Sequence, residues 1–274
     1  MTRSTRRGFT LVEAMMGTGV LVLVLGGVLG TTMLSSNLSA KLSRSAVTVQ
    51  RGRLSVERIG LDIQAADRVL ARYPTTGTPL FRADRTSTLI LRIPRQGTPN
   101  AFDVAIYRTV ASATEGPRVL QAYAASIVNG VESVARLEGV VAREVSAFRI
   151  SLTAHETFLG NGSHMRWTLR SAAAGDDALS RQQLLVAGNE LLHGNGEDVA
   201  LDDRTLQFSS PPANGQLLDL FYNVDPDDVV LDGAGTNASI VTYGLVLSPK
   251  ARDGSKRSDH RDTSIATRLS LRNR

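Results

Sequence analysis

Residues 6–34 read RRGFTLVEAMMGTGVLVLVLGGVLGTTML, and this stretch decides how the rest of the chain is organised. The 21 residues from Ala14 to Leu34 carry no charged side chain. As an α-helix rising ~1.5 Å per residue, they would span about 30 Å, the thickness of a bilayer hydrocarbon core. The sequence therefore predicts one membrane-spanning helix close to the N-terminus.

Basic residues ahead of the apolar segment set its expected orientation. They are Arg3, Arg6 and Arg7. Because basic flanks stay on the cytoplasmic side, we expect a cytoplasmic N-terminus and an exported remainder. A secretory signal peptide is the alternative, and it needs small residues at the third and first positions before its cut. The best candidate cut follows Leu38-Ser39-Ala40, which places leucine at the third position before the cut. We therefore favour a retained anchor.

A carboxylate lies at the mouth of the apolar segment. Glu13 directly precedes Ala14. A charged side chain inside a membrane costs ~2.5 kcal/mol or more on insertion scales, so such residues have a partner or a function. Glu13 is therefore a candidate functional residue.

The run Arg6-Arg7-Gly8-Phe9, with Glu13 and an unbroken apolar helix after it, resembles the N-terminal signal of the type IV pilin and type II secretion pseudopilin superfamily. The resemblance implies a leader of residues 1–8, which a prepilin peptidase removes by cutting between Gly8 and Phe9. It also implies N-methylation of Phe9 and a filament-core helix over residues 9–36. A single-pass anchor that matches the signal by coincidence is the alternative.

The resemblance gives Glu13 a role in assembly. Cleavage after Gly8 would free an amino group on Phe9, and a carboxylate nearby in a low-dielectric layer would pair with it strongly. The implied partners are other pilins or pseudopilins and an inner-membrane assembly platform. The implied location is the inner membrane, with the C-terminal part in the periplasm, and later the pilus or pseudopilus.

Glycines recur in the apolar segment. Gly26 and Gly30 form a Gly-x-x-x-Gly spacing, which lets two membrane helices approach closely. Glycine is also frequent in membrane helices without any such role. Both interpretations stay open, and the spacing makes Gly26 and Gly30 candidate helix-packing residues.

An apolar stripe continues beyond the membrane segment with a seven-residue spacing: Leu42, Val49, Val56, Ile63 and Leu70. This periodicity predicts an amphipathic stalk helix over residues 37–73, which Tyr73-Pro74 would end. We expect the stripe to pack on the protein's own sheet. A dimeric coiled coil is the alternative, because it uses the same spacing.

From residue 87 onward the pattern changes to short alternating runs between turn residues, which predicts an antiparallel β-rich head over residues 74–274. The predicted strands are Thr88 to Ile93, Phe102 to Val110, Arg118 to Ala124, Val145 to Leu152, Met165 to Leu169, Thr205 to Phe208, Leu217 to Tyr222, Ser239 to Leu247 and Ile265 to Leu271. One long helix followed by strands makes the fold class α+β. The order of these runs resembles the large minor members of the superfamily, the J-type pseudopilins and PilW-like minor pilins, so we expect the lollipop fold of pilins.

Residues 171–238 are strongly acidic, with twelve acidic and two basic side chains. Their turn-rich composition predicts an insertion or extended loop region. Four carboxylates in one loop are weak calcium candidates: Asp225, Asp227, Asp228 and Asp232. The spacing of an EF-hand is not met, and a solvated acidic loop is the default interpretation, so we expect no cofactor and keep calcium as an alternative.

The C-terminal 26 residues are basic, although the chain has a net charge of only +5. Five basic side chains lie around turn residues in this region: Lys250, Arg252, Lys256, Arg257 and Arg261. They could bind DNA or the acidic region of a neighbouring subunit. A solvated loop is the default interpretation of such a run of charges.

The chain lacks the usual signatures of an enzyme. It has no cysteine, which excludes disulfides, thiolate catalysis and cysteine-bound zinc. It also has no His-Glu-x-x-His, Gly-x-Ser-x-Gly or Walker motif. We therefore predict no enzymatic activity. The resemblance of the N-terminal signal implies a structural subunit, a minor pilin or pseudopilin at or near a filament tip. The alternative is a membrane-anchored β domain that never polymerises and binds calcium or another ligand.

Overall fold

The computed structural model describes residues 11–111, 118–175, 182–186, 189–193, 199–225, 238–248 and 262–271. Within them the chain forms one long helix, α1 (Leu11–Ala65), followed by strands that are all paired antiparallel. The fold class is therefore α+β, as predicted. The chain divides into two compact units, Met1–Val49 and Gln50–Arg274, and α1 runs through the boundary between them.

The strands are β1 (Arg68–Val69), β2 (Arg72–Tyr73), β3 (Phe81–Arg82), β4 (Thr88–Pro94), β5 (Ala101–Val110), β6 (Arg118–Val128), β7 (Val131–Glu132), β8 (Arg136–Leu159), β9 (Arg166–Thr168), β10 (Gln183–Val186), β11 (Asn189–His193), β12 (Val199–Asp202), β13 (Thr205–Phe208), β14 (Leu217–Val224), β15 (Ala238–Leu247) and β16 (Thr263–Ser270). All nine predicted strands are confirmed, although several run longer than predicted.

The main sheet is organised by β8, which is 24 residues long. Its first part pairs with β6, its middle with β15 and its last part with β14. Irregular register interrupts the β6–β8 ladder at three places, and Glu144 of β8 has a positive φ of 60°. Such bulges bend a strand and increase its twist, which allows one strand to serve three neighbours.

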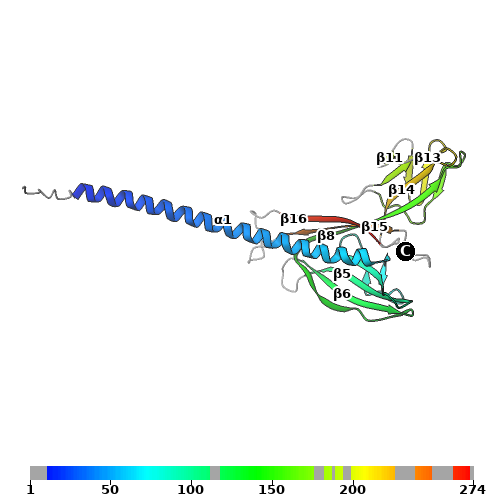
Figure 1. Cartoon of the computed structure of the whole chain (residues 1–274), viewed down its shortest axis with the longest axis horizontal. Coiled ribbons are helices and arrows are strands. Elements are labelled where there is room, and N and C mark those ends of the chain that lie inside the picture. The colour runs from blue at the N-terminus through cyan, green and yellow to red at the C-terminus, as the bar shows by residue number, and fades with distance from the viewer. Residues whose placement is uncertain are drawn as a thin grey trace, which may run out of the picture. The chain divides into compact units, whose positions relative to one another are not determined.

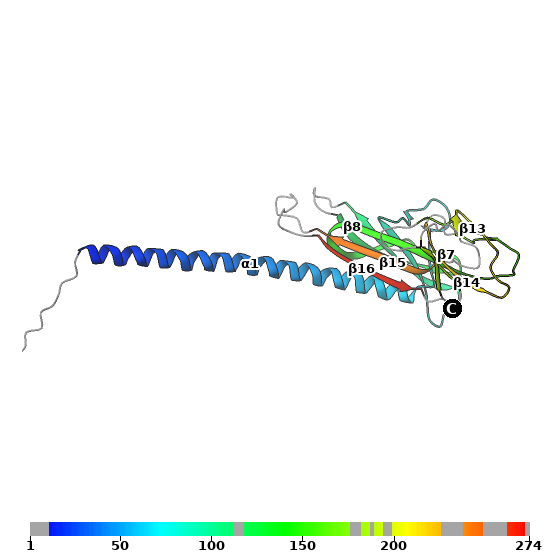
Figure 2. The same ribbon diagram turned by 90° about the horizontal axis from the view of Figure 1, so that it is seen from above.

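The C-terminal part of α1 lies along this sheet (Figure 1), and Figure 2 shows it beside β15 and β16. Val56, Ile59 and Ile63 are buried in the same core as Tyr243 and Leu245 of β15. Leu54 and Leu61, elsewhere on the helix surface, are exposed. The predicted stripe thus packs on the protein's own sheet over this part of the helix.

Polar contacts also join α1 to the sheet. The Tyr107 hydroxyl donates to Asp62 Oδ2 at 2.5 Å, and Ser55 Oγ donates to the Val141 carbonyl oxygen at 2.8 Å. Burial raises the pKa of the Asp62 carboxyl, and the Tyr107 hydrogen bond and the charge of Arg58 only partly offset this effect. These contacts fix the position of residues 50–65 on the sheet.

The stalk helix ends earlier than predicted. It stops at Ala65, and the next residues form β1 and β2 instead of continuing to residue 73. The Asp67 N–H donates to the Arg92 carbonyl, and the Leu70 N–H donates to the Ile90 carbonyl. The backbone after Ala65 therefore pairs with β4 and does not continue the helix. Leu70 is still buried, as its place in the stripe predicts.

The acidic region 171–238 is not simply a loop. It contains β10 to β13 as well as β14, which is hydrogen-bonded to β8 and β10 in the main sheet. β12, β13 and β9 form a separate three-stranded sheet. Trp167 of β9 packs near Phe208 and Phe158, with ring centroids 5.3 and 6.3 Å away, so it contributes to packing.

Candidate functional site

The first described part of α1 is apolar and exposed. Large apolar side chains from Leu11 to Val47 are 41–79% exposed. The helix contains an 18-residue window of mean hydropathy 2.0, none of which is buried inside the protein. By length and composition it is able to cross a membrane, in agreement with the predicted single pass.

Glu13 lies in the first turn of this helix. The N-terminus of a helix carries a partial positive charge, which favours a carboxylate at this place. The expected cleavage and methylation residues, Gly8 and Phe9, lie outside the described residues, as do the leader arginines Arg3, Arg6 and Arg7. Their predicted roles therefore stay predictions.

Hydroxyl groups in the apolar segment are satisfied within the helix. Thr18 Oγ1 donates to the Ala14 carbonyl at 3.0 Å, and Thr32 Oγ1 donates to the Val28 carbonyl at 3.0 Å. Thr31 Oγ1 makes the same kind of bond to Val28, at 2.9 Å. Because these hydroxyls have hydrogen-bond partners inside the helix, the free-energy cost of placing them in lipid is lower than for unpaired hydroxyls.

The glycines of α1 fall into two groups. A Cβ atom added at Gly26 or Gly30 would meet no atom within 4 Å outside the helix itself. At Gly60, by contrast, it would lie 3.1 Å from the Tyr243 hydroxyl and 3.1 Å from Leu269 Cδ1. Close packing within the chain therefore explains Gly60 and leaves Gly26 and Gly30 unexplained.

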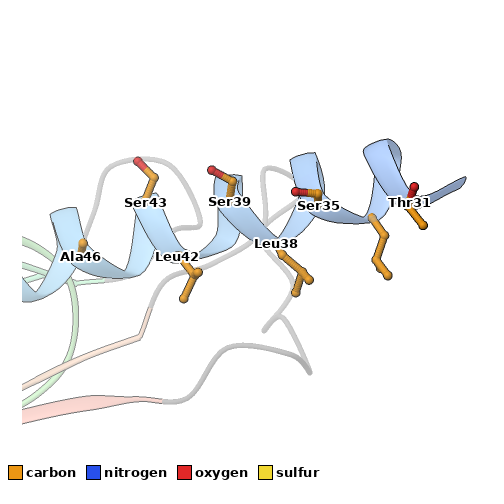
Figure 3. Close-up of a pocket in the computed structure, with 8 residues that line it drawn as sticks. Thr31, Ser35, Leu38, Ser39, Leu42, Ser43 and Ala46 are labelled. Atoms are coloured by element: carbon orange, nitrogen blue, oxygen red, sulfur yellow. The ribbon is translucent and has the colours of Figure 1, made fainter. Parts of the chain in front are cut away.

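A shallow hollow of about 670 Å³ runs along the helix from Thr31 to Ala46. Figure 3 shows Ser35, Ser39 and Ser43 pointing to one side of the helix, while Leu38 and Leu42 point to the other. Each set repeats every four residues, the spacing of the ridges and grooves by which helices pack against each other. This row of serines was not predicted, although its four-residue spacing is visible in the sequence.

The calcium candidates are not brought together in the part of the chain that the structure describes. Asp225 forms an ion pair with Arg85, while Asp227, Asp228 and Asp232 lie outside the described residues. Among described residues no group of three or more histidine or acidic side chains is arranged to hold a metal ion. The basic residues from Lys250 to Arg261 also lie outside the described residues.

The candidate functional element is therefore the exposed apolar part of α1, with Glu13 in its first turn. The pilin-like signal at residues 6–13 remains an expectation from the sequence. No family model, no curated protein and no solved structure matches the chain.

Proposed function

We propose that the chain is a minor pilin or pseudopilin, a structural subunit that assembles at or near the tip of a type IV pilus or type II secretion pseudopilus. One observation carries the proposal. In a single continuous helix, the large apolar side chains up to Val47 are exposed, whereas Ile59 and Ile63 are fully buried. An exposed apolar surface of this size needs lipid or other helices to cover it.

The proposed subunit spends its life in two environments. Before assembly, residues 14–34 cross the inner membrane, with the leader in the cytoplasm and the β-rich part in the periplasm. A prepilin peptidase removes residues 1–8 on the cytoplasmic face of this membrane. After assembly, the same apolar surface packs against the helices of neighbouring subunits. The long helix on an antiparallel sheet supports the pilin lollipop as its fold.

Glu13 has a physical role in this cycle. Cleavage after Gly8 frees a positively charged amino group on Phe9, and neither charge is cheaply solvated in lipid or in a helix bundle. Pairing of Glu13 with the amino group of a neighbouring subunit lowers the free-energy cost of removing both charges from water. Subunit addition is then favoured over return to the membrane.

The variant Glu13→Leu tests this role in a host that supplies the peptidase and the assembly machinery. Cleavage after Gly8 should persist, while the amount of the chain in sheared filaments should fall at least tenfold. Glu57→Leu is the matched control, because Glu57 is exposed on the same helix outside the apolar segment, and it should assemble normally. Normal incorporation of Glu13→Leu would defeat the charge-pair role.

A membrane-anchored β domain that never polymerises is the competing function. It explains the apolar segment equally well, but it makes the pilin-like signal at residues 6–13 a coincidence. Its calcium-binding form loses one candidate ligand, because Asp225 is paired with Arg85.

A further inference from the structure

A cleft of about 540 Å³ opens in the β-rich unit. It lies where β1, β4 and β5 meet the hairpin of β6 and β7, and its lining includes Arg68, Arg92, Phe102, Asn129 and Glu132. Its volume lies within the range of ligand pockets, and its lining holds three charged side chains.

Two arginines face each other across strands in this cleft. Arg68 of β1 and Arg92 of β4 are directly opposite in the register of the sheet. Like charges at such positions repel and destabilise a sheet. The pair therefore costs stability unless enough carboxylates are present.

Arg92 has a complete set of partners. Its Nε donates to Asp67 Oδ1 at 3.0 Å, and its Nη2 donates to Asp67 Oδ2. Its guanidinium also lies 4.0 Å from the centre of the Phe102 ring, a favourable cation–π arrangement. Asp67 is thus engaged by Arg92 through both carboxylate oxygens.

Arg68 lacks an equivalent partner. Its Nε is 3.8 Å from Asp67 Oδ2, beyond hydrogen-bonding distance. This nitrogen is buried and has no hydrogen-bond acceptor among the residues that the structure describes. Burial lowers the pKa of Arg68, the charge of Arg92 lowers it further, and the charge of Asp67 only partly offsets these two effects. The structure therefore holds a charged group in an unfavourable place.

Glu132 does not supply the missing carboxylate. Its Oε1 accepts from the Thr75 N–H at 2.7 Å and from the Thr75 hydroxyl at 2.5 Å. Its Oε2 accepts from the Thr76 hydroxyl at 2.8 Å. No ion pair joins Glu132 to Arg68 within the described ranges. The carboxylate of Glu132 is held by neutral donors, and Arg68 shares the single carboxylate of Asp67 with Arg92.

We propose that this cleft binds the carboxylate of an acidic peptide segment, with Arg68 as the residue that recognises it. A guanidinium binds a carboxylate through two parallel hydrogen bonds, and Arg68 shares its nearest carboxylate, Asp67, with Arg92. The cleft is much larger than a carboxylate alone. Thr75, Asn100 and Asn129 line it and offer hydrogen bonds to peptide groups on either side of the acidic residue.

Calorimetric titration of the full chain in detergent micelles tests this proposal. The probe is N-acetyl-Gly-Glu-Gly-amide, and the matched peptide contains glutamine in place of glutamate. We expect at least tenfold tighter binding of the glutamate peptide, and loss of this preference in Arg68→Gln. Arg149→Gln, which alters an exposed arginine of β8, should keep the preference. Equal binding of the two peptides to the unmodified chain, or an unchanged preference in Arg68→Gln, would overturn the proposal.

A folding control separates recognition from structural support. Because Arg68→Gln removes one of two repelling charges, its thermal midpoint should equal or exceed that of the unmodified chain. A midpoint several degrees lower would mean that Arg68 supports the fold, and would count against the proposal. Arg68→Lys provides a second variant, since it keeps the charge without the two-pronged geometry. We expect it to fold normally and to bind the glutamate peptide more weakly.

Discussion

The two ends of helix α1 have the same backbone conformation but opposite surroundings. From Leu11 to Val47 its large apolar side chains are exposed, and its glycines have open space around them. From Gln50 to Ala65 its apolar stripe is buried on the sheet, and Gly60 is in close contact with β15 and β16. Helical periodicity alone does not distinguish the two ends. What differs is whether the chain itself supplies the surface that covers the apolar side chains.

The largest expected contrast is between two truncations of apolar side chains. Ile59 is fully buried, so Ile59→Ala should lower the free energy of unfolding by about 2–5 kcal/mol. Leu38 is 52% exposed, so Leu38→Ala should change it by less than about 0.5 kcal/mol. Denaturation of the full chain in detergent measures both. Trp167 is the only tryptophan, and its fluorescence reports on the β-rich part.

Equal losses in the two variants would contradict the comparison, because Leu38 would then have to be packed within the chain. Leu42→Ala is a useful repeat, since Leu42 is 71% exposed in the same row. It should behave as Leu38→Ala does.

A smaller contrast is expected between the two groups of glycines. In Gly60→Leu, the new side chain must displace Tyr243, whose hydroxyl donates to the Val56 carbonyl. We expect a net loss of about 1–2 kcal/mol, because overpacking costs more than the better helix propensity of leucine returns. Gly26→Leu should leave the unfolding of the β-rich part unchanged and should reduce incorporation into filaments.

The control for the glycine pair is Gly17→Leu, since Gly17 also has open space around it but is not part of the Gly26–Gly30 spacing. If Gly17→Leu and Gly26→Leu assemble equally well, the Gly-x-x-x-Gly spacing is not a packing site.

Much of the fold was predictable because its signals are local. The charge-free segment from Ala14 to Leu34 and the alternating strands between turn residues depend only on nearby residues. The end of α1 was not predictable in this way. Leu70 fits the seven-residue stripe and is buried, yet pairing of β1 with β4 determines its backbone conformation.

The candidate functional residues also differ in whether their signal is local in the sequence. Glu13 and the Gly26–Gly30 spacing are visible in the sequence because they belong to one short segment. The cleft was not predictable, since Arg68, Arg92 and Glu132 come from three strands, and only their register shows that one carboxylate serves two arginines. The short strands β10 to β12 were missed because they lie in a region whose acidic, turn-rich composition predicted a loop.

The most direct test of the central claim is the mass of the mature N-terminus in a host with a prepilin peptidase. The claim is that the N-terminal part of α1 is a membrane and assembly element whose leader is removed. Mass spectrometry of the purified chain should find Phe9 as the first residue, with one methyl group on its amino nitrogen. An intact Met1, or a first residue that follows a cut after Ala40, would contradict it.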